Sequence, residues 1–456
     1  MSGVPGAPSL PRVLAGVAER GSLDLSAHLE VHGPAPELAP GRRGRPGELV
    51  DEVERAGLRV RGGAGFPTAL KMHAVAGARG RPRGRTVVVN ALEGEPASRK
   101  DRALIAGAPH LVLDGAVLAA RAVAAGEVVL CVSESAVETL DAALRAGAER
   151  RVLRERVHVR VIAVPDGYVG GQESALVQHL NGGPPLPTFT PPMIFEQGVG
   201  GHPTLLSNAE TFAHVALIAR HGGAWFRSLG TPEHPGSALV TLGGPVPRPG
   251  VYEIEHGVPL RSLIEAAGGL EEPLRAVLVG GYAGTWIDAV HAGTLTLDDV
   301  GLGAHGASTG AGVVLLLGER PCPVAETVRV AEWLAGESAS QCGPCEHGLL
   351  AVARGLRLWA AGAAGESGAA EQRRLASVIR GRGACRHPDG TLRFAASAIE
   401  VFGAEFEDHG AAGPCDGCGA PGVLPLPRPS RAPRAPRARA PRRTSRPARA
   451  PARAAR

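Results

Sequence analysis

The chain has 456 residues, which suggests about two to four domains with ample material for buried cores. Its net charge of +5 comes from residues 428–456, which hold 11 arginines and no acidic residue, so the remainder carries −6 and is mildly acidic. Because no run approaches the roughly 18 apolar residues of a membrane span, and the N-terminus lacks a signal-peptide apolar region, we expect a cytoplasmic protein that reaches the inner face of a membrane only through a complex.

The first two hundred residues predict an α/β fold. Residues 1–45 are rich in Pro and Gly without periodicity, which indicates a loose lead-in. A short amphipathic helix follows at 47–56. Apolar strands at 87–90, 128–132 and 157–164 then alternate with helices at 111–124 and 136–148. Such alternation predicts a parallel sheet covered on both faces, within a domain spanning 46–235, with ligands at the loops that follow the strands.

The sequence changes character near Gly236. Short strands at 238–244 and 250–254, a helix at 259–269 and a strand at 276–280 indicate a small ββα-type domain over 236–320. Apolar residues at helical spacing from Thr327 to about Phe406 predict a helical domain over 321–412. Residues 413–456 hold a Cys-x-x-Cys pair followed by an Arg-, Pro- and Ala-rich tail. The Ala-Pro-Arg repeats of this tail cannot bury a core and are expected to be disordered.

Lysine occurs only twice, at Lys71 and Lys100, against 47 arginines. A general pressure has turned cationic positions into Arg, so a retained Lys indicates a site that needs a compact ammonium. Lys71 follows a glycine-rich segment, Arg61-Gly62-Gly63-Ala-Gly65-Phe66, whose free amides can bind phosphate. A plain turn would give the same glycine pattern.

Three further segments carry groups suited to a nucleotide-like ligand. Asn90 can bond a heterocycle edge, and Glu93 and Glu95 can accept hydrogen bonds from ribose hydroxyls, although a solvated acidic loop has the same composition. Tyr168-Val-Gly-Gly171-Gln-Glu173 joins two glycines to a carboxylate at a helix start. A fourth segment ends in Asn208 and Thr211.

Together with Gln341-Cys342-Gly-Pro-Cys345, these motifs resemble the flavin-bearing, NADH-oxidising subunit of bacterial respiratory complex I, known as the 51 kDa or F subunit. Relatives in that family serve as diaphorase subunits in NAD-linked hydrogenases and formate dehydrogenases, and the resemblance covers roughly Leu49 to His409. It implies an α/β protein with a Rossmann-like, FMN-binding parallel-sheet domain, a small β-grasp domain of the soluble-ligand-binding type, and a C-terminal helical bundle with a [4Fe-4S] cluster. The residues that it places around FMN are Arg61, Gly62, Gly63, Gly65, Lys71, Asn90, Glu93, Tyr168, Gly171, Glu173, Asn208 and Thr211; Phe66 and Glu95 match contacts to NADH.

Several positions depart from the family pattern. Gln172 replaces a glutamate, Leu92 an aspartate and Thr190 a lysine, while Ala74 and Met193 occupy positions of aromatics that clamp adenine. A base–aromatic stack contributes about 1–3 kcal/mol, so the loss of two would weaken NADH binding by about 10²-fold or more. The flavin pocket is thus expected to be kept and the dinucleotide pocket to be eroded.

The cysteine pattern departs as well. The family has four cluster cysteines, and here the first is Ala339, which leaves Cys342, Cys345 and Cys385. Three thiolates can hold a [3Fe-4S] cluster, or a [4Fe-4S] cube whose fourth ligand is His347, Cys322, Cys415, Cys418 or a small molecule. A zinc site that joins Cys342-x-x-Cys345 to Cys415-x-x-Cys418 is the rival interpretation. Cys131 lies in an apolar strand and is expected to be core.

The sequence therefore predicts an FMN- and iron–sulfur-dependent electron-transfer subunit, an NADH dehydrogenase or diaphorase relative. Its partner would be a ferredoxin-like protein or a reductase subunit. Two alternatives remain open: a flavoprotein with another donor, such as ferredoxin, and a non-catalytic scaffold that binds zinc or no metal. The arginine-rich tail can bind an anionic surface, but it lacks the interleaved aromatics of nucleic-acid readers.

Overall fold

The computed structural model describes residues 2–3, 10–42, 44–63, 65–78, 84–149, 157–363 and 368–427. Residues up to Leu426 form one compact unit, and a second unit begins at Pro427. The disorder predicted for the arginine-rich tail falls on 428–456, which lie outside the described residues.

A four-stranded, wholly parallel sheet forms the centre of the first region, with the strand order β4-β3-β2-β5. Its strands are β2 (Thr86–Ala91), β3 (Glu127–Val132), β4 (His158–Ala163) and β5 (Thr204–Asn208). The first three lie where the apolar runs predicted strands. The fourth was not predicted, because its apolar run is only Leu205–Leu206.

Alternate strand residues pack against two different sets of helices, as a sheet buried on both faces requires. Val87 and Val89 belong to the larger core cluster, and Val88 and Cys131 belong to the smaller one on the opposite face. The larger cluster is covered by α3 (Glu48–Ala56), α4 (Thr68–Gly77), α5 (Lys100–Gly107), α6 (Pro109–Ala122), α7 (Val137–Glu149, preceded by the turn η2 at Glu134–Ala136) and α9 (Ala209–Phe226). The smaller is covered by α8 (Glu173–Leu180) and η3 (Val199–Gly201). The predicted α/β architecture is confirmed.

A second, mixed sheet has the order β1-β7-β6-β10-β8-β9. Its strands are β1 (Ser2–Gly3), β6 (Ser237–Gly243), β7 (Gly250–Glu255), β8 (Leu274–Val279), β9 (Thr285–Asp288) and β10 (Val313–Gly318). On one face Val277 and Val314 pack with the short helices α10 (Leu260–Ala266), α11 (Ala289–Ala292) and α12 (Asp299–Gly303). On the other face Leu278 and Leu315 share a core cluster with the C-terminal helices.

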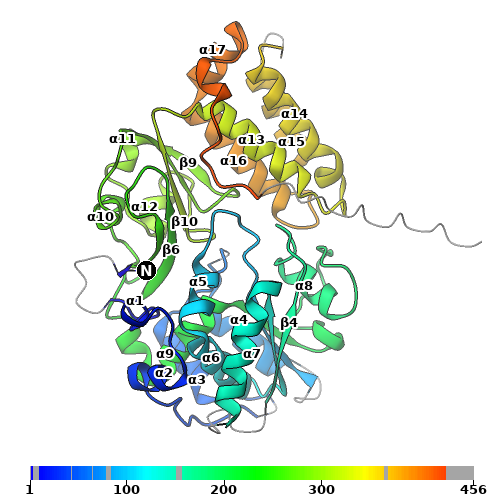
Figure 1. The fold of residues 1–456 in the computed structure, drawn as a ribbon. Coiled ribbons are helices and arrows are strands. Elements are labelled where there is room, and N and C mark those ends of the chain that lie inside the picture. Colours follow the sequence, from blue (N-terminus) through cyan, green and yellow to red (C-terminus); the bar gives the residue numbers. More distant parts are fainter. Residues whose placement is uncertain are drawn as a thin grey trace, which may run out of the picture. The chain divides into compact units, whose positions relative to one another are not determined.

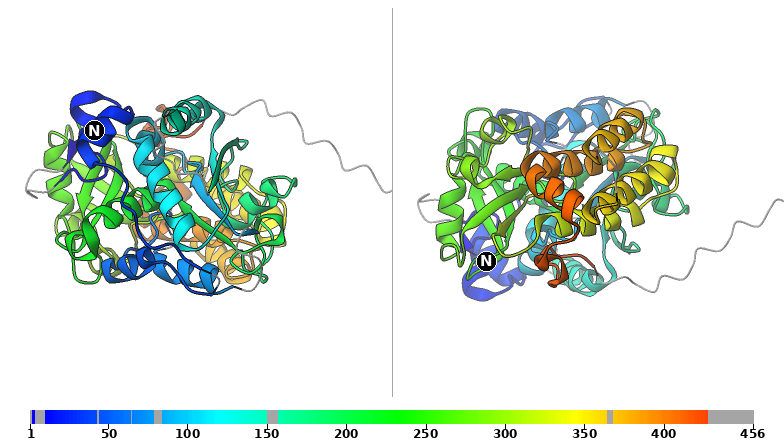
Figure 2. Two further views of the ribbon diagram at one scale, coloured as in Figure 1. Left: turned by 90° about the horizontal axis from the view of Figure 1, so that it is seen from below. Right: turned by 90° about the horizontal axis from the view of Figure 1, so that it is seen from above.

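The C-terminal helices gather beside this second sheet (Figures 1 and 2). They are α13 (Pro323–Gly336), the π-helical turn η4 (Pro344–Gly348), α14 (Leu349–Ala360), α15 (Gly368–Ile379), α16 (His387–Val401) and α17 (Gly403–Ala412), followed by the 3-10 turn η5 (Asp416–Gly419). Helical spacing predicted this region from Thr327, but α13 begins earlier because Cys322 caps it and Pro323 occupies its first turn.

The N-terminal segment is more ordered than its composition indicated. Helices α1 (Val17–Arg20) and α2 (Leu25–His32) pack on the first region. The buried Glu253 carboxylate accepts hydrogen bonds from the amides of Arg12, Val13 and Leu14 at 2.8, 2.9 and 3.1 Å. A carboxylate from β7 thus fixes a stretch that has no periodic pattern of its own.

Among the described residues, no single helix combines the length and the hydropathy of a membrane span. Helices α5 and α6 satisfy those criteria only as a pair, and their axes differ by 98°.

Candidate functional site: a cavity shared by three regions

The order of the parallel strands creates a crevice between β2 and β5. The chain proceeds from β2 to β3 and β4 on one side, and then returns to place β5 on the other side of β2. Ligands of open α/β sheets bind at such a reversal, beyond the carboxyl ends of the strands. Asn90 and Asn208 are register partners at these two ends, and a cavity of about 660 Å³ opens there.

Three regions of the chain line this cavity. Of the residues that the sequence singled out, the lining includes Arg61, Gly62, Gly63, Asn90, Glu93, Glu95, Tyr168, Gly171 and Asn208. The loops of the second sheet contribute Gly280, Gly284, Ser308 and Gly310, and the C-terminal region contributes Cys385, Arg386, His387, Asp389 and Arg393. A ligand in this cavity would therefore touch the first region and a predicted cluster cysteine at once.

Much of the cavity wall is backbone, because side chains have no room at several glycines. A Cβ on Gly94 would lie 2.5 Å from the Tyr168 carbonyl oxygen. Gly310, at φ +50°, would place a Cβ 2.6 Å from the Cα of Gly280. These approaches require glycine at both positions, and glycine-rich backbone of this kind can bind a phosphate-bearing cofactor closely.

The guanidinium of Arg61 fits an anionic ligand. Burial lowers the pKa of Arg61 to about 10, against its usual 12.5. Its Nε has no hydrogen-bond partner among the described residues. Its Nη2 donates to the Pro235 carbonyl oxygen at 3.3 Å, and Arg61 lines both this cavity and a neighbouring one of about 160 Å³. An anion bound in either cavity would therefore be attracted to this guanidinium.

Asn90 joins two of the predicted segments. Its Nδ2 donates to the carbonyl oxygen of Gly171 at 2.8 Å, and its Oδ1 accepts from the amide of Leu92 at 3.1 Å. The side chain at the end of β2 therefore fixes both the acidic loop and the glycine turn before α8.

The two glutamates of the acidic loop hold backbone. Glu93 accepts hydrogen bonds from the Ser98 hydroxyl at 2.8 Å and from the amides of Asp101 and Arg102 at 2.9 and 3.1 Å, so it caps the N-terminus of α5. Glu95 accepts from the amide of Tyr282 at 2.8 Å, and burial raises the pKa of its carboxyl to about 7.

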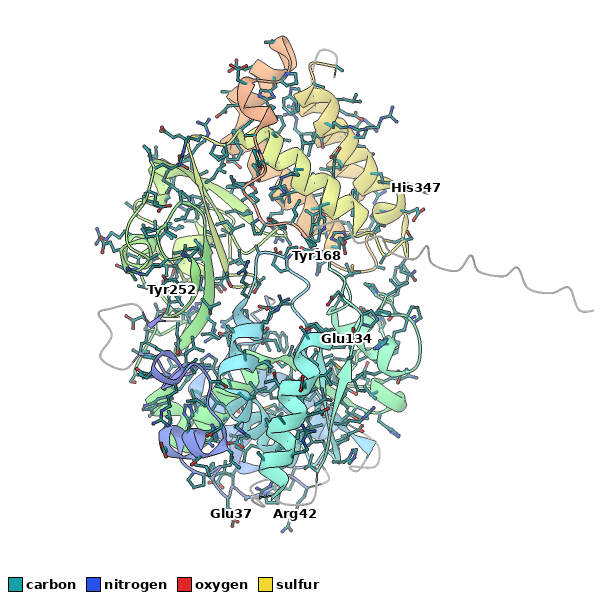
Figure 3. The ribbon with its side chains drawn as sticks, in the orientation of Figure 1. Glu37, Arg42, Glu134, Tyr168, Tyr252 and His347 are labelled. Atoms are coloured by element: carbon teal, nitrogen blue, oxygen red, sulfur yellow. The ribbon has the colours of Figure 1, made fainter. Side chains whose placement is uncertain are left out.

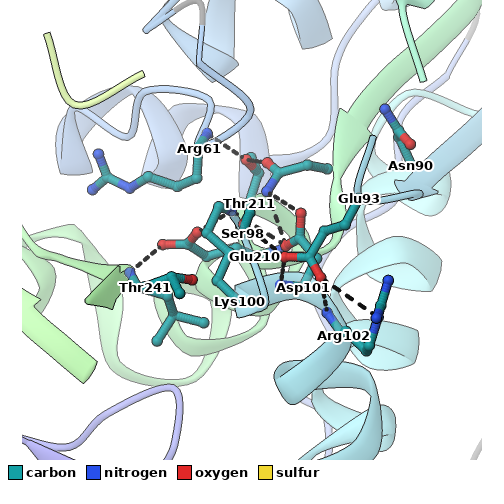
Figure 4. Close-up of polar contacts among 12 residues, drawn as sticks. Arg61, Asn90, Glu93, Ser98, Lys100, Asp101, Arg102, Glu210, Thr211 and Thr241 are labelled. Atoms are coloured by element: carbon teal, nitrogen blue, oxygen red, sulfur yellow. Dashed lines mark hydrogen bonds and ion pairs between the residues drawn. The ribbon is translucent and has the colours of Figure 1, made fainter. Parts of the chain in front are cut away.

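A buried network extends from the cavity wall, which Lys100, Asp101 and Asn208 line (Figure 4). The sequence predicted Asn208 and Thr211 as site residues, but not Asp101 and Glu210, the partners of Lys100. The ammonium of Lys100 lies 2.6 Å from Glu210 and 3.4 Å from Asp101. Asp101 accepts from Nδ2 of Asn208 at 3.1 Å, and Thr211 donates to Oδ1 of Asn208 at 2.5 Å. Burial opposes ionisation of Glu210, but Lys100 and His214 outweigh it and lower the pKa of Glu210 to about 2. In the sequence, the retention of Lys100 as one of two lysines against 47 arginines was the observation that indicated this network.

Five of the residues predicted to contact FMN or NADH do not line the cavity: Gly65, Phe66, Lys71, Glu173 and Thr211. Lys71 donates to Glu173 and to the Leu206 carbonyl oxygen, so its ammonium is already paired. Thr211 accepts a hydrogen bond from the amide of Arg61 at 2.9 Å and so holds the backbone of a residue that does line the cavity. Gly65 lines a neighbouring cavity of about 160 Å³, and the Phe66 side chain is 45% exposed.

The substitution at Gln172 has a local explanation. Its Oε1 accepts from the amides of Ser174 and Ala175 at 2.8 and 3.0 Å, so the side chain caps α8. An amide oxygen performs this task without placing another negative charge on the cavity wall, which Gln172 also lines.

The predicted cluster cysteines come from two segments. Cys342 and Cys345 lie at the start of the helix that continues into α14, and Cys385 precedes α16. Burial raises the pKa of Cys385, and the neighbouring Cys345 and Cys342 raise it further. The Ala384 amide donates to the Cys342 sulfur at 3.4 Å. The residues gathered here offer three thiols, and Ala339, which stands at the position of the family's first cluster cysteine, is buried.

Tyr168 connects the cavity to the helices. Its ring meets those of Trp333 and His387 edge-on, each at 5.2 Å between centroids, and its amide donates to Glu337 at 3.0 Å. Figure 3 shows Tyr168 where the parallel-sheet region meets the C-terminal helices.

The remaining cysteines form a separate group. Cys322, Cys415 and Cys418 gather with His409 so that their ligand atoms all lie within 4.8 Å of one another. The rival interpretation, a zinc site that joins Cys342-x-x-Cys345 to Cys415-x-x-Cys418, is therefore wrong, because the second pair meets Cys322 and His409 instead. For the same reason Cys322, Cys415 and Cys418 are engaged elsewhere than at the missing cluster ligand. His347 is exposed.

Family models match three stretches of the chain. Residues 53–217 match the Nuo51 FMN-binding domain, 239–281 match the SLBB domain, and 325–409 match the iron–sulfur binding region of NADH-ubiquinone oxidoreductase F. The matches fall on the parallel sheet, the mixed sheet and the C-terminal helices.

Curated relatives and solved structures agree with these matches. The chain is 33% identical to the F 2 subunit of NADH-quinone oxidoreductase from Rhizobium meliloti (strain 1021), over 80% of this chain and 89% of that protein. It is 32% identical to the corresponding F protein of Streptomyces coelicolor, over 80% and 83%. A chain of an NAD⁺-reducing [NiFe]-hydrogenase superposes with a TM-score of 0.72 at 33% identity over 79% of this chain, which spans 62% of that one. The chain therefore belongs to the family of NADH-quinone oxidoreductase F subunits.

Proposed function

We propose that this protein is an NADH dehydrogenase-like oxidoreductase that transfers electrons from NADH through FMN and an iron–sulfur cluster to a partner protein. The observation that carries the proposal is the shared cavity, lined both by the residues at the ends of β2 and β5 and by Cys385. FMN supplies the ability to accept two electrons as a hydride and release them singly, and the protein supplies orientation and electrostatics.

The residues assigned to FMN are those that the cavity brings together. The amides at Gly62, Gly63 and Gly171 and the buried guanidinium of Arg61 would hold the phosphate and the ring edge. Asn90 holds the Gly171 backbone directly, whereas Asn208 acts through Thr211, which accepts from the Arg61 amide. The assignments of Lys71 and Glu173 become supporting roles, because they pair with each other outside the cavity lining.

The three thiolates of Cys342, Cys345 and Cys385 would hold the cluster. They suffice for a [3Fe-4S] cluster, or for a [4Fe-4S] cluster completed by a ligand other than Ala339. Because Cys385 lies in the cavity wall, the cluster would sit beside the flavin, as direct electron transfer between them needs.

A flavoprotein with another electron donor is the second candidate, and the NADH side of the site favours it. The aromatic positions hold Ala74 and Met193, and Phe66 does not line the cavity. Glu95, the other residue matched to NADH, already accepts hydrogen bonds from the amides of Tyr282 and Ala97. Reduced ferredoxin is the donor that this alternative names.

Anaerobic stopped-flow mixing decides between the two donors. The protein, purified with flavin and cluster, is mixed with NADH, NADPH or reduced ferredoxin while bleaching of the visible flavin band is followed. Fast bleaching by NADH supports the first proposal, and bleaching only by reduced ferredoxin supports the second. A folded protein that takes up no FMN would refute both and leave the scaffold interpretation.

The proposed acceptor is a ferredoxin-like protein or a reductase subunit, in the cytoplasm or at the inner face of the membrane within a complex. Support comes from the relatives, which are named as parts of NADH-quinone oxidoreductase and of a hydrogenase. A role for the arginine-rich tail on an anionic surface is part of the same proposal and rests on its charge alone.

A further inference from the structure

A second group of potential metal ligands gathers apart from the predicted cluster cysteines. Cys322 caps the N-terminus of α13, His409 belongs to α17, Cys415 precedes the turn η5, and Cys418 lies within it. Among the described residues, Cys342, Cys345 and Cys385 do not form a set whose ligand atoms all lie within 4.8 Å, whereas these four do.

The spacing of the four ligand atoms is that of a single tetrahedral ion. The sulfur of Cys418 lies 3.6 Å from that of Cys322 and 3.8 Å from that of Cys415, and the Cys322 sulfur lies 3.7 Å from Nε2 of His409. Zinc binds thiolate at about 2.3 Å and imidazole at about 2.0 Å in a tetrahedron, which separates two sulfurs by about 3.8 Å and a sulfur from a nitrogen by about 3.5 Å. An iron–sulfur cube places each thiolate on a different iron and so spreads the sulfurs further.

Neighbouring backbone groups hold two of the four potential ligands, His409 and Cys322, in position. Nδ1 of His409 lies 3.3 Å from the Ala360 carbonyl oxygen, so a proton on Nδ1 has an acceptor and Nε2 is left with its lone pair toward the sulfurs. The Cys322 sulfur accepts a hydrogen bond from the Ala325 amide at 3.4 Å, which holds its side chain at the start of α13. Both Cys322 and His409 are buried, so the protein surrounds these two ligands.

We propose that Cys322, His409, Cys415 and Cys418 form a structural zinc site, separate from the cluster and from the flavin cavity. All four positions are filled by protein, which is the mark of a structural rather than a catalytic zinc. The site joins the start of α13, the last helix and the segment that follows it.

The hydrogen bonds beyond the site show what the ion would stabilise. Glu326, in the first turn of α13, accepts from the amides of Val423 and Leu424 at 3.1 and 2.9 Å. The Tyr282 hydroxyl donates to the Pro425 carbonyl oxygen at 2.7 Å. The ion would therefore pin the segment 413–426 across the helices, immediately before the arginine-rich tail.

Metal analysis of the full-length protein, purified with its flavin and cluster, tests the proposal. We expect one zinc per chain, lost in Cys415→Ser and in His409→Gln but kept in the control Cys131→Ala, which removes a buried thiol in β3. Iron and acid-labile sulfide should be unchanged in all three variants. Zinc that persists in Cys415→Ser, or iron that falls together with zinc, would contradict a separate site.

Two measurements on the unaltered chain keep the test valid if a variant fails to fold. X-ray absorption at the zinc edge should show three sulfur neighbours and one nitrogen, and Co²⁺ exchanged into the protein should give thiolate charge-transfer bands. Mononuclear iron in place of zinc, a disulfide among Cys322, Cys415 and Cys418, or absence of both zinc and Co²⁺ binding would each overturn the assignment.

Discussion

Replacing Lys100 by methionine removes the cation at the cavity wall that contacts two buried carboxylates, those of Glu210 and Asp101. The side chains of Lys100, Glu210 and Asp101 are 4%, 1% and 7% exposed, so water cannot take over the role of the ammonium. Methionine keeps a similar apolar length, and the perturbation is therefore mainly electrostatic.

The size of the effect follows from the pKa of Glu210. Without Lys100, the buried Glu210 carboxylate is expected to take up a proton. Protonation lowers the free energy of unfolding by about 1.4 kcal/mol for each pH unit above the ordinary Glu210 pKa of 4.5. The cost is then about 3 kcal/mol at pH 7 and below about 1 kcal/mol at pH 5. The upper value agrees with the about 3–5 kcal/mol lost when one partner of a buried pair is removed.

The assay is urea unfolding of Lys100→Met and of the unaltered protein at pH 7 and pH 5, followed by tryptophan fluorescence. Adding Glu210→Gln should restore most of the loss, since the amide oxygen can still accept from the Leu239 amide, which now donates at 2.7 Å. Lys71→Met is the matched control, because Lys71 and Glu173 are 21% and 40% exposed and such pairs contribute about 1 kcal/mol or less. A loss at Lys100 that equals the control, or one that does not shrink at pH 5, would refute the reasoning.

Three further predictions concern the cavity and the cluster. Glu95 has a folded pKa of about 7 against an ordinary 4.5, so its ionisation destabilises the folded state progressively as the pH rises from 4.5 to 7. The Glu95→Gln variant should therefore gain thermal stability over the unaltered protein across that window, by at most about 3 kcal/mol. A stability difference that does not change with pH would contradict this. Gly94→Ala forces a methyl group against the Tyr168 carbonyl and should lower the flavin content of the purified protein. In the control Gly77→Ala nothing lies within 4 Å of the added methyl group, so the flavin content should be unchanged. Equal flavin content in the two variants would contradict a tightly packed cavity wall at Gly94. Ala339→Cys should raise iron per chain, or convert a three-iron electron paramagnetic resonance signal into a four-iron one, and unchanged iron and spectrum would count against the alignment of this loop.

The elements of the fold could be predicted where a run of neighbouring apolar residues is long enough to indicate a strand or a helix. The apolar runs of β2, β3 and β4 are long enough to indicate strands, and their alternation with helices indicates a parallel sheet. Strand β5 contains too few apolar residues to signal itself. Strand β10 was also missed, although Val313 to Leu317 is a continuous apolar run and carried a usable signal.

The site could be predicted only as a set of loops, because its contacts cross long sequence separations. The motifs identified residues such as Arg61 and Asn90, but no local pattern says that Lys100 pairs with Glu210 or that Glu95 bonds the amide of Tyr282. Cysteine spacing has the same limit, since several groupings fit one sequence. Only the fold brings Cys322 to Cys418 and His409.

The cavity draws its walls from Arg61 near one end of the chain and from Cys385 to Arg393 near the other. We expect the first region to form its sheet during synthesis before the C-terminal wall of the cavity has left the ribosome. If FMN occupies this cavity, as proposed, its binding site is complete only after the whole chain is made, and the bound cofactor would stabilise the association of regions distant in the sequence.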